Sequence, residues 1–329
     1  MQYLKSLSFR QLQIFASAAN TLNFARTSEA LFLTQPAVSM QIKQMEDMVG
    51  LPLFERSGRK VRLTHAGETL RDCATQMLDL WRGTDERIAG LHGLERGRVT
   101  LGIVSTAKYF APKLLGMFKR THPGIEVRLS LYNRETILEA LRTGTVDLTI
   151  MGQPPVDIAV VAVALADHPS VVIASVAHPL AQREHLRVTE LAQEPFIGRE
   201  IGSGTRSSME RFFAGYGVQP RFEFELTSNE SMKQAVMAGM GLAFISLHTI
   251  GLEYRTGNLA ILDVEGLPLI RRWMMVQLEE KRLSPAAEAF REFLIAETGG
   301  YLESHFPDPS SVGHSEASFM RRAFARDML

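Results

Sequence analysis

At 329 residues, the chain exceeds one ordinary domain of about 100 to 200 residues, so at least two folded units are expected. The 45% hydrophobic and 22% charged residues are typical of a globular protein and exclude a disordered or fibrous chain. No uninterrupted apolar run reaches the about 18 residues of a membrane span, and residues 1–10 do not form a signal peptide. With only one cysteine, Cys73, the composition predicts a cytoplasmic protein without disulfides, cysteine metal clusters or a membrane partner.

The zero net charge conceals an uneven distribution. Residues 1–65 carry eight Lys and Arg against four Asp and Glu, which leaves 28 basic against 32 acidic side chains for the rest of the chain. A basic N-terminal region on an acidic body indicates that one end of the protein meets phosphate and the other does not.

The first 33 residues predict two short helices. Apolar spacing from Phe9 indicates a helix that ends near Asn20. Asn23 can cap a second helix, which breaks near residue 32. The stripe of this helix that we expect to be buried consists of Phe24, Ala25, Ala30 and Leu31.

A third helix is expected from Thr34 or Gln35 to Gly50, with Pro36 in its first turn, where a missing N–H costs nothing. Its outward face carries Gln35, Ser39, Met40 and Lys43. Amide and hydroxyl groups can read base edges in a major groove, and a lysine can meet phosphate. The same pattern also fits the solvated face of a small three-helix bundle, and the helix alone does not separate the two interpretations.

A basic turn follows this helix directly. Short extended stretches at residues 53–54 and 61–63 flank the turn Arg56-Ser57-Gly58-Arg59-Lys60. A basic turn is usually only solvated surface, but next to a polar-faced helix it predicts a wing that contacts the DNA backbone.

Three stretches of this region closely resemble the LysR-type transcriptional regulators: residues 30–42 (ALFLTQPAVSMQI), 51–56 (LPLFER) and 63–67 (LTHAG). The resemblance implies a winged helix-turn-helix whose third helix enters the major groove of operator DNA. The residues that we expect at the DNA are Gln35, Pro36, Ser39, Met40, Lys43, Arg56, Arg59 and Lys60. Met40 departs from the family, which most often has arginine there, so one contact is either lost or exchanged for an apolar one.

A long helix is expected over residues 64–91. Its apolar seam consists of Leu70, Ala74, Met77, Leu78, Trp81 and Ile88. In the family this linker helix pairs two chains, which implies a homodimer or homotetramer on a palindromic operator. Cys73 lies on this helix without basic neighbours in the sequence, so packing explains it better than redox chemistry.

From Arg98 onward, strands alternate with helices. Strands are predicted at 99–104, 126–132 and 146–151, with helices at 108–121 and 134–142 between them. A similar series recurs at 171–174, 203–216, 222–226, 228–238 and 242–246, and a last strand at 271–278 precedes a helix at 285–297. The pattern predicts an α/β fold with a mainly parallel sheet in two similar lobes, joined near Asp167 and again near 266–268. Such Rossmann-like lobes form a hinged cleft like that of periplasmic binding proteins.

Ligand groups are expected at the loops that follow these strands. The candidates are Ser105, Thr106, Lys108, Asn133, Gln153, Gly204, Thr205, Arg206 and Asn229. Helix starts rich in small and hydroxyl residues, beside a lysine and an arginine, favour an anionic effector. Any single member also fits an ordinary N-cap, so the prediction depends on the set as a whole.

The effector region resembles the CbbR-like branch of the family, which regulates Calvin-cycle and RuBisCO operons. The stretches that carry this resemblance are residues 105–112 (STAKYFAP), 150–155 (IMGQPP) and 227–236 (TSNESMKQAV). It implies that a phosphorylated metabolite or NADPH acts as effector, with no permanently bound cofactor. In the expected mechanism the effector closes the lobes, shifts the spacing of the DNA-binding heads and changes contact with RNA polymerase.

Alternative functions find less support. No HExxH, GxSxG or P-loop motif is present, so we expect neither a catalytic residue nor a metal site. A regulator of another metabolic operon fits the DNA-binding region equally well, whereas a solute-binding module leaves the basic head unexplained. The expected boundaries are a winged helix-turn-helix at 1–63, a linker helix at 64–94, an effector domain at 95–299 (lobe I at 95–167 and 267–299, lobe II at 168–266) and a tail at 300–329.

Overall fold

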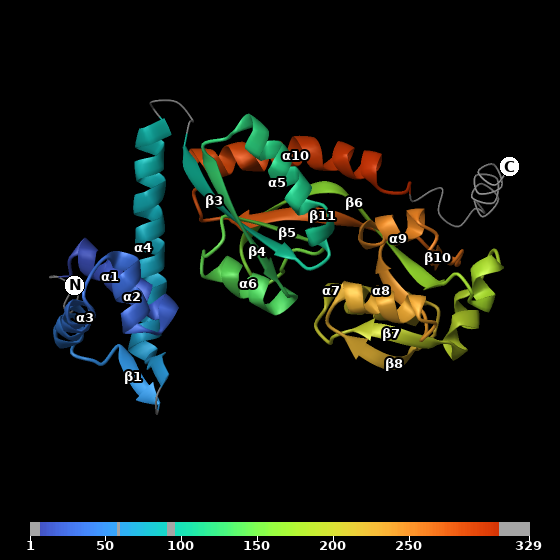
Figure 1. Cartoon of the computed structure of the whole chain (residues 1–329), viewed down its shortest axis with the longest axis horizontal. Coiled ribbons are helices and arrows are strands. Elements are labelled where there is room, and N and C mark those ends of the chain that lie inside the picture. Colours follow the sequence, from blue (N-terminus) through green and yellow to red (C-terminus); the bar gives the residue numbers. More distant parts are fainter. Residues whose placement is uncertain (1–6, 58–59, 91–95, 309–329) are drawn as a thin grey trace. The chain divides into compact units, whose positions relative to one another are not determined.

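The computed structural model describes residues 7–57, 60–90 and 96–308, which fold as two compact units that divide near residue 94 (Figure 1). The N-terminal unit consists of helices α1 (Phe9–Thr21), α2 (Phe24–Leu31) and α3 (Gln35–Val49), the hairpin β1 (Phe54–Ser57) and β2 (Lys60–Leu63), and the long helix α4 (His65–Gly90).

Side-chain caps begin the three short helices. Ser8 and Gln11 form a capping box at α1, Asn23 accepts from two amides at the start of α2, and Thr34 accepts from the Ala37 amide at α3. Each of these helices ends at a residue in the left-handed region, of which Gly50 is the one without a Cβ. The helix-turn-helix is therefore encoded locally, by residues next to the elements they start and stop.

The buried face of α2 differs from the expected one. Ala25 and Ala30 are exposed, and the fully buried positions are Thr27 and Ser28. The Thr27 hydroxyl donates to the Asn23 carbonyl oxygen at 2.9 Å, and the Ser28 hydroxyl donates to the Ala25 carbonyl oxygen at 2.7 Å. Because these hydroxyls are satisfied inside the helix, they can occupy the core face that apolar periodicity assigned to other residues.

The expected seam of α4 divides into two parts. Leu70 and Ala74 are buried against the helices of the same unit, where they complete the apolar core of the N-terminal unit, called the head below. Met77, Trp81 and Ile88 are about half exposed or more, at 48%, 63% and 58%. The second half of the helix therefore carries exposed apolar side chains, although the Trp81 ring also packs on Phe9 at 4.9 Å between centroids.

Lobe I of the C-terminal unit begins with three strands in the order β5-β3-β4. Its elements are β3 (Gly97–Val104), the 3₁₀ turn η1 (Ala107–Tyr109), α5 (Ala111–Thr121), β4 (Ile125–Tyr132), α6 (Arg134–Arg142) and β5 (Leu148–Met151). Strand β3 is parallel to both neighbours, as the alternation of strands and helices predicts. Helices α5 and α10 (Pro285–His305) contact each other through Phe118 and Phe290, and α6 packs against a separate apolar cluster of the lobe (Figure 1).

Lobe II is built around a second set of strands and helices. Its elements are the 3₁₀ turns η2 (Pro179–Gln182) and η3 (Val188–Gln193), β7 (Pro195–Arg199), α7 (Gly204–Gly215), β8 (Arg221–Leu226), α8 (Asn229–Met237), β9 (Ala243–Ser246), η4 (Leu247–Thr249), α9 (Gly251–Arg255) and β10 (Leu259–Ile261). Strands β7 and β8 are parallel, and helices α7 and α8 pack against different apolar clusters of the lobe. Strands β7 and β10 have no counterpart in the predicted series.

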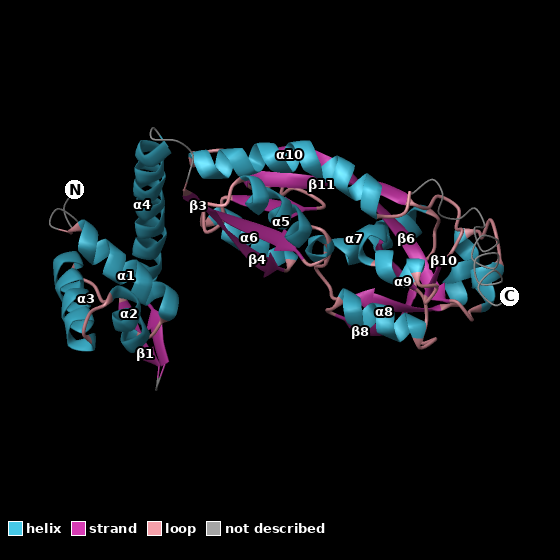
Figure 2. Cartoon of the chain, turned by 45° about the horizontal axis from the view of Figure 1, so that its top comes forward, coloured by secondary structure: helices cyan, strands magenta, loops and turns pink. Residues whose placement is uncertain are grey.

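Two long strands connect the lobes. Strand β6 runs without a break from Val160 to Ser175. All of β11 (Leu269–Leu278) pairs antiparallel with residues 160–170 of β6 (Figure 2). The prediction of a mainly parallel sheet was therefore wrong, because β6 and β11 turn the sheet into a mixed one. The expected join between the lobes near Asp167 lies inside β6, a single strand that both lobes share.

The C-terminal helix was predicted too short. It continues eight residues beyond Glu297, to His305, so the tail expected from residue 300 begins later. The added part of the helix contains two consecutive glycines, 299 and 300, which are unfavourable in a helix interior. Leu302 is 3% exposed and the Phe306 ring contacts His248 at 4.9 Å between centroids, so burial of these side chains keeps the helix intact across the glycines.

Candidate DNA-binding face and effector pocket

Helix α3 presents the face expected to meet DNA. Its buried side is Val38, Ile42 and Met45, which pack into the head's core. The predicted contacts Gln35, Pro36, Ser39, Met40 and Lys43 are all exposed, Met40 at 55%. Lys43 makes no ion pair with any described residue, so its charge is available to a phosphate.

A carboxylate on α3 that sequence reasoning missed hydrogen-bonds to the start of the β1–β2 hairpin, the wing. Glu46 Oε1 accepts hydrogen bonds from the backbone amides of Leu53 at 2.8 Å and Phe54 at 3.1 Å. A shallow groove beside it includes Ser39 and Lys43 from α3 and Val61 from β2. The recognition helix and the hairpin are thereby held at a fixed angle, as DNA recognition by a winged helix requires.

The wing itself is only partly described. Strands β1 and β2 pair antiparallel, with Arg56 opposite Val61 and Ser57 opposite Lys60. Arg59 lies outside the described residues, and so do the side chains of Arg56 and Lys60. Their DNA contacts stay predictions.

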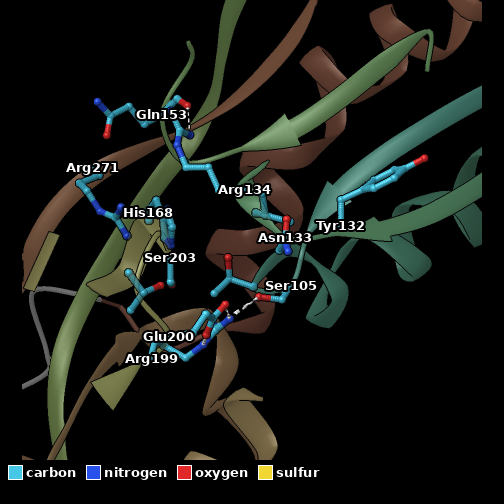
Figure 3. Close-up of a pocket in the computed structure, with 15 residues that line it drawn as sticks. Ser105, Tyr132, Asn133, Arg134, Gln153, His168, Arg199, Glu200, Ser203 and Arg271 are labelled. Carbon is cyan, nitrogen blue, oxygen red and sulfur yellow. Dashed lines mark hydrogen bonds and ion pairs between the residues drawn. The ribbon is translucent and has the colours of Figure 1, made fainter. Parts of the chain in front are cut away.

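The C-terminal unit contains a pocket between its lobes, at the ends of the parallel strands (Figure 3). Six of the nine expected effector residues line it: Ser105, Thr106, Asn133, Gln153, Gly204 and Thr205. Other lining residues come from β4, α6, β6, β7, the loop after β7, and β11: Tyr132, Arg134, His168, Arg199, Glu200, Ser203 and Arg271. The sheet topology therefore brings residues that are far apart in the sequence to one place.

Lys108 and Arg206 do not line the pocket. Lys108 lies in η1, 4.0 Å from Glu230 and over the Tyr109 ring. Arg206 stacks on Phe222 at 3.4 Å from the ring centroid and forms an ion pair with Glu210 at 2.5 Å. Both cations therefore have a carboxylate partner outside the pocket, and their positions in the sequence do not show this pairing.

Asn229 also lies outside the pocket lining, where it positions another residue. It is 1% exposed, and its Oδ1 accepts from Arg199 Nη1 at 2.8 Å. Arg199 in turn pairs with Glu200 and donates to Ser105 Oγ at 3.3 Å, across the lobes. This arginine therefore already has a carboxylate partner and serves to connect the walls of the pocket.

Two further arginines line the pocket and make no ion pair within the described part of the chain. Arg271 donates from Nη1 to Ser208 Oγ at 2.8 Å and from Nη2 to Ser170 Oγ at 3.2 Å. Arg134 donates from Nη1 to the Gln153 carbonyl oxygen at 2.7 Å. Burial lowers the pKa of Arg271 to about 10, with a smaller contribution from Arg211, so Arg271 remains a cation at neutral pH.

Of these two arginines, only Arg134 had a signal in the sequence. Arg134 follows Asn133, already expected at the pocket, and begins α6. Arg271 lies on the crossing strand β11, directly opposite His168 of β6, and no pattern in the sequence pairs the two. Cations held by hydroxyl and carbonyl groups alone are arranged to receive an anion from outside the chain.

Comparison with known proteins agrees with this architecture. Residues 9–68 match the model of the bacterial regulatory helix-turn-helix of the LysR family, and residues 92–299 match the LysR substrate binding domain. The chain belongs to the LysR family. This LysR-family protein is therefore a DNA-binding transcriptional regulator with an effector-binding domain, as the motifs of its first 67 residues predict.

Its relatives include regulators of RuBisCO genes. It is 45% identical over 300 residues to the HTH-type transcriptional regulator CfxR of Cupriavidus necator, covering 91% of this chain and 95% of that protein. It is 46% identical over 291 residues to the RuBisCO operon transcriptional regulator of Allochromatium vinosum, covering 88% and 96%. The regulatory domain of CcmR from Synechocystis PCC6803, solved in complex with 2-PG, is 41% identical with a TM-score of 0.59 and covers 61% of this chain and 97% of that one.

No helix among the described residues is both long and apolar enough to cross a membrane. Cys73 is exposed on α4, with its Sγ 3.9 Å from the Met77 Sδ, and no group of three or more metal-binding side chains gathers in the described ranges.

Proposed function

We propose that this LysR-family regulator controls carbon-fixation genes, and that a phosphorylated metabolite or NADPH bound between its lobes modulates its hold on operator DNA. The names of its relatives support the target, and the 2-PG complex of the Synechocystis domain supports a small-molecule effector. The chemistry of the pocket supports an anion.

The observation that carries the anionic effector is the partly buried guanidinium of Arg271. A buried cation without a counter-ion is costly, because hydroxyl groups replace only part of its lost hydration. Arg271 has two serine hydroxyls and no carboxylate, and its Nε is buried without a partner. A phosphate group between Arg271 and Arg134 supplies the missing charge and can accept hydrogen bonds from both.

The exposed half of α4 supports an oligomer. Met77, Trp81 and Ile88 lie at intervals of four and seven residues, which places them on one face of a helix. We propose that this face pairs with a second copy of the chain and gives a dimer or tetramer for a palindromic operator. Effector binding then changes the spacing of the DNA-binding heads and their contact with RNA polymerase.

The test is DNA binding by fluorescence anisotropy to the promoter region beside the protein's own gene. Titrations with and without ribulose 1,5-bisphosphate, 2-PG and NADPH, at two salt concentrations, separate specific from purely electrostatic binding. We expect specific, salt-sensitive binding whose affinity or protein–DNA stoichiometry changes with at least one of these ligands.

An Arg271→Ala variant and a scrambled promoter are the controls. Arg271→Ala is expected to bind the promoter and to lose the response to ligand. Specific DNA binding with no response to any of these ligands counts against the carbon-fixation effectors and favours a regulator of another operon. Failure to bind any specific site contradicts the proposed function.

A further inference from the structure

A buried histidine lines the effector pocket with both ring nitrogens unpaired. His168 lies on β6, 2% exposed, and neither Nδ1 nor Nε2 has a hydrogen-bond partner. Its ring stacks on Trp273 at 3.8 Å between centroids with 12° between the planes. A buried polar group usually finds a partner in the folded chain, so the unpaired nitrogens indicate a partner that comes from outside.

The place where such a partner fits is beside Gly152. A methyl group built on Gly152 would lie 3.1 Å from His168 Nδ1 and 3.6 Å from Arg271 Nη1. Because residue 152 has no Cβ, no side chain fills the space on this side of the two nitrogens. Figure 3 shows the His168 ring next to the Arg271 guanidinium, and an anionic oxygen can bind both when a small shift of these side chains uncovers the buried Nδ1.

The charged surroundings of His168 are mostly positive. Arg271 faces His168 from β11. His248 belongs to η4, and its ring centroid is 6.4 Å from that of His168. The Nδ1 of His248 accepts a hydrogen bond from the Trp273 indole at 3.0 Å. Asp167, the adjacent acid on β6, pairs with Arg272 instead.

On the other side of the pocket, Arg134 makes no ion pair, and Glu200 is held by Arg199. No carboxylate among the described residues pairs with His168, and burial, Arg271 and His248 lower the pKa of His168 well below its usual range. Without a ligand the ring is therefore neutral.

We propose that His168 binds the effector's anionic group as an imidazolium, so that effector binding takes up one proton from solvent at this ring. This inference rests on the proposed anionic effector and adds its regulation by pH. An anion beside Gly152 reverses the local balance of charge, because it attracts the imidazolium that Arg271 alone repels. The proton moves from a buffer molecule to a ring nitrogen of His168, which then donates to the anion.

The sign of the pH dependence follows from this change. In the free protein the depressed pKa of His168 leaves the ring neutral, and in the complex its pKa is raised. Effector affinity is therefore high at low pH and falls as pH rises through the pKa of the complex, with Kd rising by up to about tenfold per pH unit.

The test is isothermal titration calorimetry of the full-length protein with ribulose 1,5-bisphosphate and with inorganic sulfate near pH 8, about two units above the second phosphate pKa of about 6. Runs in Hepes and in Tris, which differ in heat of ionisation, give the number of protons taken up. Sulfate stays dianionic, so any proton that is taken up from solvent when sulfate binds must be bound by the protein. We expect proton uptake that grows toward about one per site when the sulfate titration is repeated at lower pH, where more of the bound ring is protonated.

Two variants assign that proton. His168→Gln should lose the uptake and bind about tenfold more weakly. His122→Gln, which removes the histidine that follows α5 and lies outside the pocket, should behave like the unaltered chain. In a Trp81→Phe background, Trp273 is the remaining tryptophan, and an imidazolium stacked on it should quench its fluorescence when the ligand binds.

The outcomes separate this inference from the proposed function. Binding without proton uptake by the unaltered chain, or with equal uptake by His168→Gln, overturns the role of His168 and leaves the anionic effector standing. Sulfate binding with proton uptake supports His168 even if ribulose 1,5-bisphosphate does not bind. Failure of ribulose 1,5-bisphosphate, sulfate, 2-PG and NADPH alike to bind overturns the anionic effector and this inference with it, whereas the promoter titration tests DNA binding separately.

Discussion

The DNA-binding face and the effector pocket are both polar surfaces, but their residues are distributed differently along the chain. The predicted contacts on α3 come from nine consecutive residues, 35–43, and the helix period alone places them on one side. The pocket collects residues from 104 to 271, on both lobes and on both crossing strands. The first surface is a property of one helix, whereas the second is a property of the sheet topology.

This difference explains where sequence reasoning succeeded. Along α3, the buried residues Val38, Ile42 and Met45 leave the expected contacts exposed. In the pocket, expected residues after the lobe I strands, such as Ser105 and Asn133, line the wall, whereas Arg206 lies outside it and the unexpected mid-strand Arg271 lines it. Four predictions test or challenge this contrast.

The largest effect is expected for Arg271→Ala. Removing a partly buried cation that pairs with a bound anion should weaken effector binding by about 2 kcal/mol or more, roughly 30-fold, while promoter binding without effector stays unchanged. Titration calorimetry with the effector and anisotropy with the promoter measure the two. The matched control is Arg272→Ala, because Arg272 is 63% exposed and pairs with Asp167. Equal losses in both variants would show that the pocket has been misplaced.

The next effect is expected for Glu46→Ala in the head. Two backbone amides lose their carboxylate acceptor, which should cost about 1 to 3 kcal/mol of unfolding free energy in the N-terminal unit. Urea denaturation followed by circular dichroism measures it, and Asp47→Ala, which removes an exposed acid of the same helix, is the control. An unchanged midpoint would mean that the wing does not depend on this contact.

A smaller effect is expected for Lys43→Ala. Loss of one phosphate contact should weaken binding to specific and scrambled DNA alike and reduce the slope of log K against log salt by about one. Anisotropy over a series of salt concentrations gives the slope. Lys113→Ala, an exposed lysine of α5, should leave it unchanged. A loss confined to the specific site would assign Lys43 to base recognition instead.

The smallest effect is expected for Arg206→Ala, although the sequence places this arginine among the effector residues. Its guanidinium is held by Phe222 and Glu210, outside the pocket, so effector affinity should change by less than about 0.5 kcal/mol, roughly twofold. Calorimetry beside Arg134→Ala, which removes a cation of the pocket, makes the comparison. A larger loss of effector affinity in Arg206→Ala than in Arg134→Ala would mean that Arg206 contacts the effector, as the sequence alone predicted.

Local chemistry allowed most of the elements to be predicted. Caps such as Asn23 and Thr34 start helices through hydrogen bonds to amides two or three residues away, so their effect is visible in the sequence. The exceptions have tertiary causes. Helix α10 passes two glycines because Leu302 and Phe306 are held by other elements, and α2 buries Thr27 because its hydroxyl is satisfied within the helix.

The sequence by itself determined the winged helix-turn-helix, the face of α3 that is exposed, and the family, because contiguous motifs and periodic burial act over a few residues. Only the tertiary structure decided which arginines face the effector. The antiparallel pairing of β6 with β11 sets Arg271 opposite His168, 103 positions apart in the chain, and no local pattern encodes that register. Strand pairing assembles the pocket from such distant residues, whereas the recognition helix carries its site within a few turns.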